Sequence, residues 1–199
     1  ISLQSFVVID YAALMQELAI NFRRIILRDF SEADRPAFIK YQTDPRYRHL
    51  YDFDDNPERA DKLFDLFLQW QQERPRMNTQ LAICEIGSER LLGSGGLRKI
   101  EHGVAVFGIE LAPTEWGRFR VAIDASSALL RYGFETLNLK AIIGDTASGN
   151  RRIEKLARWF GAKIVARRPG PDWMQVRGWQ EVDWEITREM WEQSPPAFA

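Results

Sequence analysis

The stretch FGIELAPTEWGR (residues 107–118) decides the fold, because it carries an apolar strand pattern directly into a polar turn. Pro113 ends the strand, and the second half of residues 115–134 has helical spacing. The loop between them, residues 116–120, contains one glycine and two arginines. Unpaired amides at a helix N-terminus attract anions, so this loop suits a phosphate or pyrophosphate. The alternative is an ordinary basic turn in solvent.

The surrounding elements follow from patterning and turn residues. Upstream, we expect a strand over 23–30, a helix that starts at Ser31 with Asp34 in a capping box, and a helix that starts at Asn56-Pro57. An antiparallel meander is predicted from three short strands, residues 81–86, 91–100 and 105–112. Further strands and helices are predicted downstream: strands 140–147, 162–168 and 182–186, and helices 151–161 and 187–193.

These elements predict a mixed α/β fold, in which an antiparallel meander joins a β-α-β-α-β half within one domain over residues 23–199. Residues 1–22 are predicted to be an N-terminal helical appendage, because the segment from Asp10 to Ile20 has helical spacing. Residues 43–56 and 169–173 are predicted to be loops.

Composition excludes several classes of protein. With 27 lysines and arginines against 28 acidic residues, the chain lacks the basic excess of a nucleic-acid or membrane-surface protein. One cysteine, Cys84, and two histidines predict neither disulfides nor a metal site, and Cys84 reads as core. The absence of a membrane-length apolar run or a signal peptide pattern favours a cytoplasmic protein.

The near-neutral total hides two opposite local fields. Residues 116–177 hold 12 basic side chains against 5 acidic ones, and residues 29–61 hold 9 acidic against 5 basic ones. We expect such a division in a protein with an anionic and a cationic substrate.

Four stretches resemble the GNAT acyltransferases, and most closely the branch that contains the ribosomal-protein N-terminal acetyltransferases. They are RRIILRDFSEAD (23–34), FGIELAPTEWGR (107–118), SGNRRIEKLARWFGA (148–162) and VDWEITREMW (182–191). The resemblance covers about Arg24 to Trp191. It implies a central, mostly antiparallel sheet flanked by helices, whose fourth and fifth strands splay apart and admit the pantetheine arm of acetyl-CoA.

The resemblance also implies roles for individual residues. The strand backbone at Ile109, Glu110 and Leu111 would bind pantetheine, as would the Asn150 side chain. The pyrophosphate would lie on the loop formed by Trp116, Gly117, Arg118, Phe119, Arg120 and Val121. The family loop reads approximately Q/R-x-x-G-x-G/A, and Phe119 and Val121 replace its two last small residues. Ala157 stands where many members carry a tyrosine acid.

Glu110 is the first candidate for a catalytic base, because it lies beside the expected thioester; the alternative is a strand carboxylate facing solvent. Asp145 and Ser148 are weaker candidates. On the acceptor side, Tyr47, Tyr51 and Asp52, with Asp54 and Asp55, would attract a cationic amine by charge and ring contacts, unless the segment is a solvated loop.

The sequence therefore predicts an N-acetyltransferase that moves an acetyl group from acetyl-CoA, without a metal, to a primary amine in a ternary complex. The acceptor would be a protein N-terminus or a small amine. The alternatives are a non-catalytic module with a degenerate coenzyme A loop and an oligomerisation scaffold built on the N-terminal segment. Four tryptophans of the tail are compatible with a pocket, a homodimer contact or core packing: Trp173, Trp179, Trp184 and Trp191.

Overall fold

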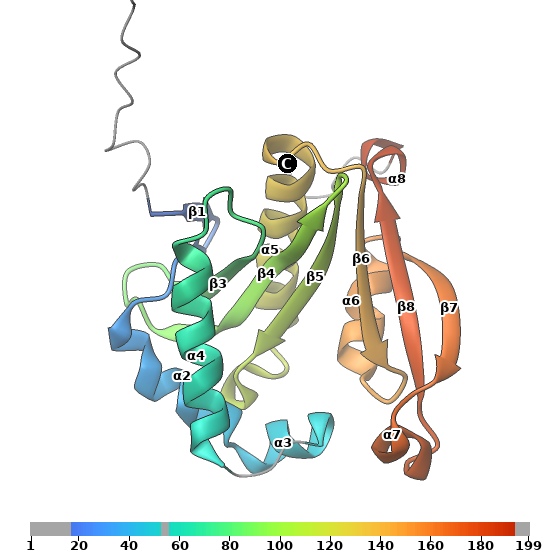
Figure 1. Ribbon diagram of the computed structural model, residues 1–199, viewed down its shortest axis with the longest axis horizontal. Helices are drawn as coiled ribbons and strands as arrows, with labels where there is room; N and C mark the ends of the chain where they lie inside the picture. The colour runs from blue at the N-terminus through green and yellow to red at the C-terminus, as the bar shows by residue number, and fades with distance from the viewer. Residues whose placement is uncertain (1–16, 53–55, 194–199) are drawn as a thin grey trace, which may run out of the picture.

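Eight strands form one sheet in the computed structural model, which describes residues 17–52 and 56–193 (Figure 1). In sheet order the strands are β1 (Ala19–Phe22), β2 (Ile25–Arg28), β3 (Thr79–Glu85), β4 (Leu91–Glu101), β5 (Val104–Leu111), β6 (Ala141–Ala147), β8 (Gln180–Thr187) and β7 (Lys163–Pro169). The β5–β6 pair is parallel and the other pairs are antiparallel. The predicted mixed α/β class and mostly antiparallel sheet are confirmed.

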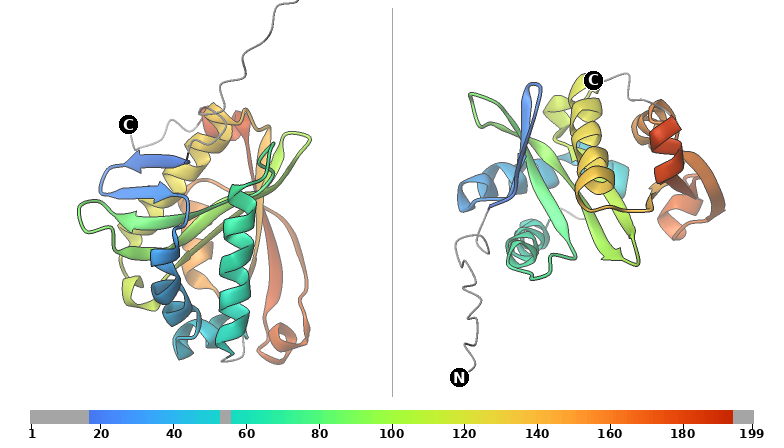
Figure 2. Two further views of the ribbon diagram at one scale, coloured as in Figure 1. Left: turned by 60° about the vertical axis from the view of Figure 1, so that its left-hand side comes forward. Right: turned by 90° about the horizontal axis from the view of Figure 1, so that it is seen from above.

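Helices cover both faces of this sheet, as the view from above in Figure 2 shows. The helices are α2 (Arg35–Gln42), α3 (Pro45–Tyr51), α4 (Pro57–Gln71), α5 (Phe119–Arg131), α6 (Arg151–Trp159), α7 (Asp172–Val176) and α8 (Arg188–Gln193). Alternation along β3 shows how the strand serves two cores. Ala82 and Cys84 pack with α2 and α4, whereas Leu81 and Ile83 pack with α5.

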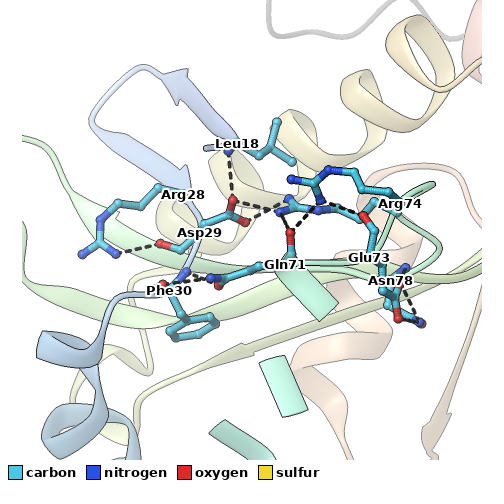
Figure 3. Close-up of polar contacts among 9 residues, drawn as sticks. Leu18, Arg28, Asp29, Phe30, Gln71, Glu73, Arg74 and Asn78 are labelled. Atoms are coloured by element: carbon cyan, nitrogen blue, oxygen red, sulfur yellow. Dashed lines mark hydrogen bonds and ion pairs between the residues drawn. The ribbon is translucent and has the colours of Figure 1, made fainter. Parts of the chain in front are cut away.

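Polar contacts fix the end of α4 to the edge of the sheet (Figure 3). The buried Asp29 carboxylate accepts hydrogen bonds from Arg76, with both N–O distances at 3.0 Å, and from the Leu18 amide at 3.0 Å. The Gln71 side chain accepts from the Phe30 amide at 2.7 Å and donates to the Phe30 carbonyl at 3.2 Å. These bonds hold α4 in the position from which it covers the site described below.

The two halves of the sheet diverge between β5 and β6 (Figure 1). Their backbone pairing covers Val104 to Val106 opposite Ala141 to Ile143 and goes no further. Beyond this point β5 continues to pair with β4, and β6 with β8. The splayed pair that the sequence predicts is therefore present, and the space between the strands opens toward the C-terminal end of β5.

The prediction of a helix from Asp10 to Ile20 is wrong at Ala19 and Ile20, which belong to a strand. Ala19–Phe22 forms β1, which pairs with β2 at the sheet edge, and residues 1–16 lie outside the described part of the chain. The alternation of exposed and half-buried side chains along β1 fits a strand, and pairing with β2 outweighs the weak helical spacing.

Two predicted loops contain short helices. Residues 45–51 of the segment 43–56 form α3, which starts because Asp44 accepts a hydrogen bond from the Arg46 amide at 2.8 Å and Pro45 occupies the first turn. Residues 172–176 form α7. The capping box predicted at Ser31 is confirmed, although it begins a 3₁₀ turn, Glu32–Asp34, that leads into α2, and the cap predicted at Asn56 is confirmed.

Candidate active site

Two adjoining cavities lie where β5 and β6 diverge. The first has a volume of about 370 Å³ and extends between the strands toward α4 and β8; the second, of about 380 Å³, lies between α3, the start of α5 and α6. Both are lined by the same central residues: Tyr47, Leu50, Tyr51, Ile109, Glu110, Asn150, Ile153 and Leu156. The tertiary structure thus brings together predicted residues from α3, β5 and the start of α6.

Glu110 is the most strongly hydrogen-bonded carboxylate of this site. Its Oε1 accepts from the Tyr41 hydroxyl at 2.6 Å, from Gln42 Nε2 at 2.7 Å and from the Ser94 hydroxyl at 3.0 Å. Its Oε2 accepts from the Tyr47 hydroxyl. The alternative of a carboxylate that simply faces solvent is wrong, because four neutral donors surround this side chain.

The tyrosine hydroxyl groups of this site stay protonated. Burial raises the pKa of Tyr41 and Tyr47 well above that of free tyrosine, and the charge of Glu110 raises them further. Burial has the same effect on the pKa of Tyr51. The three hydroxyl groups are therefore neutral at physiological pH.

Gln42 and Ser94 were not among the predicted site residues. Gln42 is fully buried and also donates to the Tyr47 hydroxyl at 3.1 Å, which links α2 to α3. Ser94 accepts from Gln80 Nε2 at 3.0 Å. No local motif marks either residue, since each reaches Glu110 only through sheet pairing or helix packing.

The loop before α5 is built around the buried carboxylate of Glu115. Arg118 donates to Glu115 at 2.6 Å and lies 3.5 Å from Glu85, and Arg90 donates to Glu115 at 2.5 Å. Arg118 thus has two carboxylate partners from the protein itself, whereas the sequence prediction left it free for a phosphate. Gly117 has a φ of +98°, a conformation that favours glycine.

Phe119 and Val121 have different surroundings: Phe119 lines the second cavity, and Val121 does not. Val121 is buried in the core beneath α5. The Phe119 ring packs edge-on against Trp159 of α6, with the centroids 5.9 Å apart. Trp116 is fixed by a hydrogen bond of 3.0 Å from its indole N–H to the Leu111 carbonyl. The exposed Arg120 forms no ion pair within the described residues.

Two cations that sequence reasoning missed lie on the wall of the second cavity. The Arg152 guanidinium lies 4.2 Å from the centre of the Trp116 ring, and Lys155 Nζ lies 4.4 Å from the centre of the Phe119 ring. Their three-residue spacing on a helix that follows Asn150 was a signal that could have identified them.

Asn150 is buried and starts α6, because its side-chain oxygen accepts from the Ile153 amide at 3.4 Å. Its side chain also lines both cavities. Asn150 therefore has a structural role at the helix start in addition to its place in the site.

Asp52 lies at the C-terminal end of α3, away from the Glu110 cluster. It accepts a hydrogen bond of 3.0 Å from Arg177, which also donates to the His49 carbonyl at 2.8 Å. These bonds join α3 to the segment after α7, on the far side of the divergent strands (Figure 1). Asp54 and Asp55 lie outside the described residues.

The weaker candidates are separated by the fold. Asp145 lines the first cavity, whereas the Ser148 hydroxyl accepts from the Gln180 amide at 3.0 Å and lies outside both cavities. Of the tail tryptophans, Trp173 and Trp184 line the first cavity, and Trp191 stacks on Phe134 in the core.

Two features are absent from residues 17–52 and 56–193. No cluster of three or more His, Cys, Asp or Glu side chains in these ranges could hold a metal ion. No helix there is both long and apolar enough to cross a membrane.

Known proteins share this architecture. The acetyltransferase (GNAT) domain family matches residues 24–163. Solved structures with the same fold include a GNAT-family acetyltransferase from Bacillus anthracis, with 19% identity, 86% of this chain and 99% of that chain covered, and a TM-score of 0.71. A spermidine N-acetyltransferase SpeG chimera from Vibrio cholerae and hSSAT is 19% identical, with a TM-score of 0.69. The match covers 84% of this chain and 97% of that chain. The chain belongs to the acetyltransferase (GNAT) domain family.

Proposed function

We propose that this protein transfers an acetyl group from acetyl-CoA to a primary amine by direct attack within a ternary complex. The observation that carries the proposal is the pair of adjoining cavities at the divergence of β5 and β6. They join a loop at a helix N-terminus, suited to an anionic donor, to the Glu110 carboxylate, suited to a cationic acceptor. Family membership supports acetyl transfer.

The residues on the donor side fit coenzyme A. Ile109 and Leu111 are on the strand edge that β6 leaves unpaired, so their backbone groups are available to the pantetheine amides. The loop Trp116 to Val121 with the start of α5 would hold the pyrophosphate, assisted by Arg152 and Lys155. Asn150 would face the pantetheine from the opposite side.

Phe119 and Val121 motivated the alternative of a non-catalytic module. In the structure Val121 packs into the core, and the Phe119 ring lies against Trp159 and beside Lys155, a cation that would accompany phosphates. We therefore assign the loop to the donor phosphates.

Glu110 would act on the acceptor amine, which must lose a proton before it attacks the thioester carbonyl. A lysine amine is neutral only about 0.04% of the time at pH 7, and an α-amine roughly 10%. Tyr47 is the one described donor to Oε2, and a carboxylate oxygen has about two lone-pair sites. Oε2 would take the amine proton, directly or through a water molecule, while Tyr41, Gln42 and Ser94 hold Oε1 in place.

The remaining steps need few further groups. Attack forms a tetrahedral oxyanion, which a backbone amide of the unpaired strand would stabilise, and its collapse breaks the C–S bond and releases the coenzyme A thiolate. Tyr51 and Tyr47 would line the acceptor path. Asp52, which pairs with Arg177, would act at its edge.

Two measurements test this proposal. Calorimetric titration should show micromolar binding of acetyl-CoA, and Glu110→Gln should reduce kcat/KM for amine acetylation by about 10²- to 10⁴-fold with little change in acetyl-CoA affinity. The exposed Glu101→Gln is the matched control and should behave as wild type. The absence of acetyl-CoA binding at millimolar concentration would reject the proposal.

A further inference from the structure

Arg98 is a cation of the first cavity, and no carboxylate of the described residues forms an ion pair with it. It is half-buried on β4, and its guanidinium lies across β5, where a Cβ atom added to Gly108 would be 2.5 Å from Arg98 Nη2. Among the residues that the structure describes, the Arg98 guanidinium has neither a hydrogen bond nor an ion pair, whereas those of Arg90 and Arg118 have both. A partly desolvated guanidinium without a partner is suited to bind an anion.

Near the Arg98 guanidinium, Gln80 has a second polar group without a hydrogen-bond partner among the described residues. This side chain is 6% exposed, and its Nε2 donates to Ser94 at 3.0 Å. Its Oε1 is buried and has no partner within the described chain. It lies over Gly96, which is the residue paired with Gly108 across β4 and β5. A donor and an acceptor, both unused, thus lie over two neighbouring glycines on one face of the sheet, the face that carries Glu110.

The charges of the cavity select the type of anion. Glu110, Asp145 and Glu185 line the same cavity as Arg98. Three carboxylates repel a dianionic phosphate. They favour a ligand that carries one negative charge together with a positively charged ammonium group. A planar carboxylate matches the fork of donors that a guanidinium presents.

The spacing along β5 limits the distance between the two groups of the acceptor. Gly108, beneath the guanidinium, and Glu110 are two residues apart on the same face, which is about 7 Å along a strand. A carboxylate on Arg98 and an amine within reach of Glu110 therefore belong to one small molecule, with only a few bonds between them.

We propose, on the basis of the function proposed above, that the acceptor is an amino acid or a similar small amine with a nearby carboxylate. Arg98 binds the carboxylate, and Gln80 Oε1 accepts a hydrogen bond from an N–H or O–H group of the acceptor. Apolar side chains on the cavity wall, Leu63 and Phe67 of α4 and Trp173, accommodate an apolar substituent.

This inference separates the acceptor from two other amines. A polyamine brings further positive charge and leaves Arg98 unpaired next to a cation. The N-terminus of a long peptide has its first backbone carbonyl, rather than a carboxylate, at the required spacing. Both kinds of amine are therefore included as acceptors in the experiment.

The experiment compares three matched acceptors: L-phenylalanine, L-phenylalaninamide and 2-phenylethylamine, with spermidine and an N-terminal peptide as further acceptors. For the wild type, we expect kcat/KM with phenylalanine to exceed that with each of the others. Arg98→Met should raise the KM for phenylalanine about 10- to 100-fold, with kcat and the KM for the amide nearly unchanged. Arg98→Lys should restore part of the loss, and Arg24→Met, an exposed arginine between β1 and β2, is the control.

A second variant acts on Arg98 without removing it. Gly108→Ala places a methyl group against the flexible end of the Arg98 side chain, which must move away. It should therefore raise the KM for phenylalanine but leave the KM for phenylalaninamide unchanged. This variant keeps the test valid if Arg98→Met folds poorly.

A binding measurement distinguishes failure of this inference from failure of the proposed function. Trp173 and Trp184 line the cavity, so tryptophan fluorescence should report phenylalanine binding with and without coenzyme A. Carboxylate-dependent binding that Arg98→Met abolishes supports the inference even if acetyl transfer is not detected. Equal or better use of 2-phenylethylamine or spermidine by the wild type, or an unchanged preference in Arg98→Met, overturns it.

Discussion

The Tyr41 hydroxyl donates a hydrogen bond of 2.6 Å to Glu110 Oε1, and this bond joins α2 to the middle of the sheet. The two residues are 69 positions apart in the sequence. Tyr41 is almost completely buried, so its bond to the carboxylate is shielded from water, where it is stronger than at a surface. The position of the proposed base therefore depends on how α2 packs on the sheet.

Replacing Tyr41 with phenylalanine tests this dependence. We expect Tyr41→Phe to lower the free energy of unfolding by about 1–3 kcal/mol, because a charged acceptor loses a buried donor. It should also reduce kcat/KM about 10-fold, with unchanged acetyl-CoA affinity. Denaturant titration and steady-state kinetics measure both effects. Tyr132→Phe, a half-buried tyrosine away from the cavities, should keep full activity, and full activity in Tyr41→Phe as well would separate the hydrogen bond from catalysis.

Coenzyme A affinity should depend more on α6 than on the arginine of the loop. Arg152 and Lys155 lie on rings at the second cavity, while Arg118 is occupied by Glu115. Arg152→Ala and Lys155→Ala should each weaken acetyl-CoA binding about 3- to 10-fold at low salt, and less at high salt because the contacts are screened. Arg118→Ala should change affinity less than about twofold. Calorimetry at two salt concentrations measures this, and the reverse order of effects would contradict the assignment.

Acid stability should depend on Asp34. Burial raises the pKa of this carboxyl, but hydrogen bonds from Arg28 at 2.7 and 2.9 Å, together with that from the Ser31 amide, outweigh burial and lower it overall. Because the folded-state pKa lies below the unfolded value, Asp34 stabilises the fold above about pH 4, and the contribution disappears as pH falls through the folded-state pKa.

Asp34→Asn should therefore lower the free energy of unfolding by about 1–3 kcal/mol at pH 7. The difference in the free energy of unfolding between wild type and Asp34→Asn should become smaller below about pH 4. Denaturant titrations across this range measure the gap, with Glu101→Gln as the exposed control. A gap that is independent of pH would show that Asp34 acts through packing alone.

The single cysteine should be unreactive while the chain is folded. Cys84 is completely buried on β3, and burial raises the pKa of its thiol to about 11. At pH 8 a thiol reagent should modify it at least about 100-fold more slowly in buffer than in denaturant. Fast modification of native protein would contradict the packing of β3 against α2 and α4. An unreactive Cys84 also allows coenzyme A release to be followed with the same reagent.

Local sequence signals determined most of the secondary structure. Short strand-like runs separated by turn residues predicted β3, β4 and β5, and Asn56-Pro57 predicted the start of α4, because these signals depend on neighbours a few residues away. The start of α3 has a similar signal at Asp44-Pro45, but it stands within an acidic and aromatic stretch that favours a loop. β1 had weak local signals, and only pairing with β2 determined it.

The sequence by itself also determined which strand and which loop form the site, since FGIELAPTEWGR contains both. The tertiary structure alone decided what the charged side chains do there. Arg118 is occupied because sheet pairing brings Glu85 and Arg90 to the same loop as Glu115, and Glu110 is enclosed by donors from α2, α3 and β4. Arg98 lies over Gly108 because a glycine on the adjacent strand leaves room. Such partners depend on strand register and helix packing, which act between residues far apart in the chain.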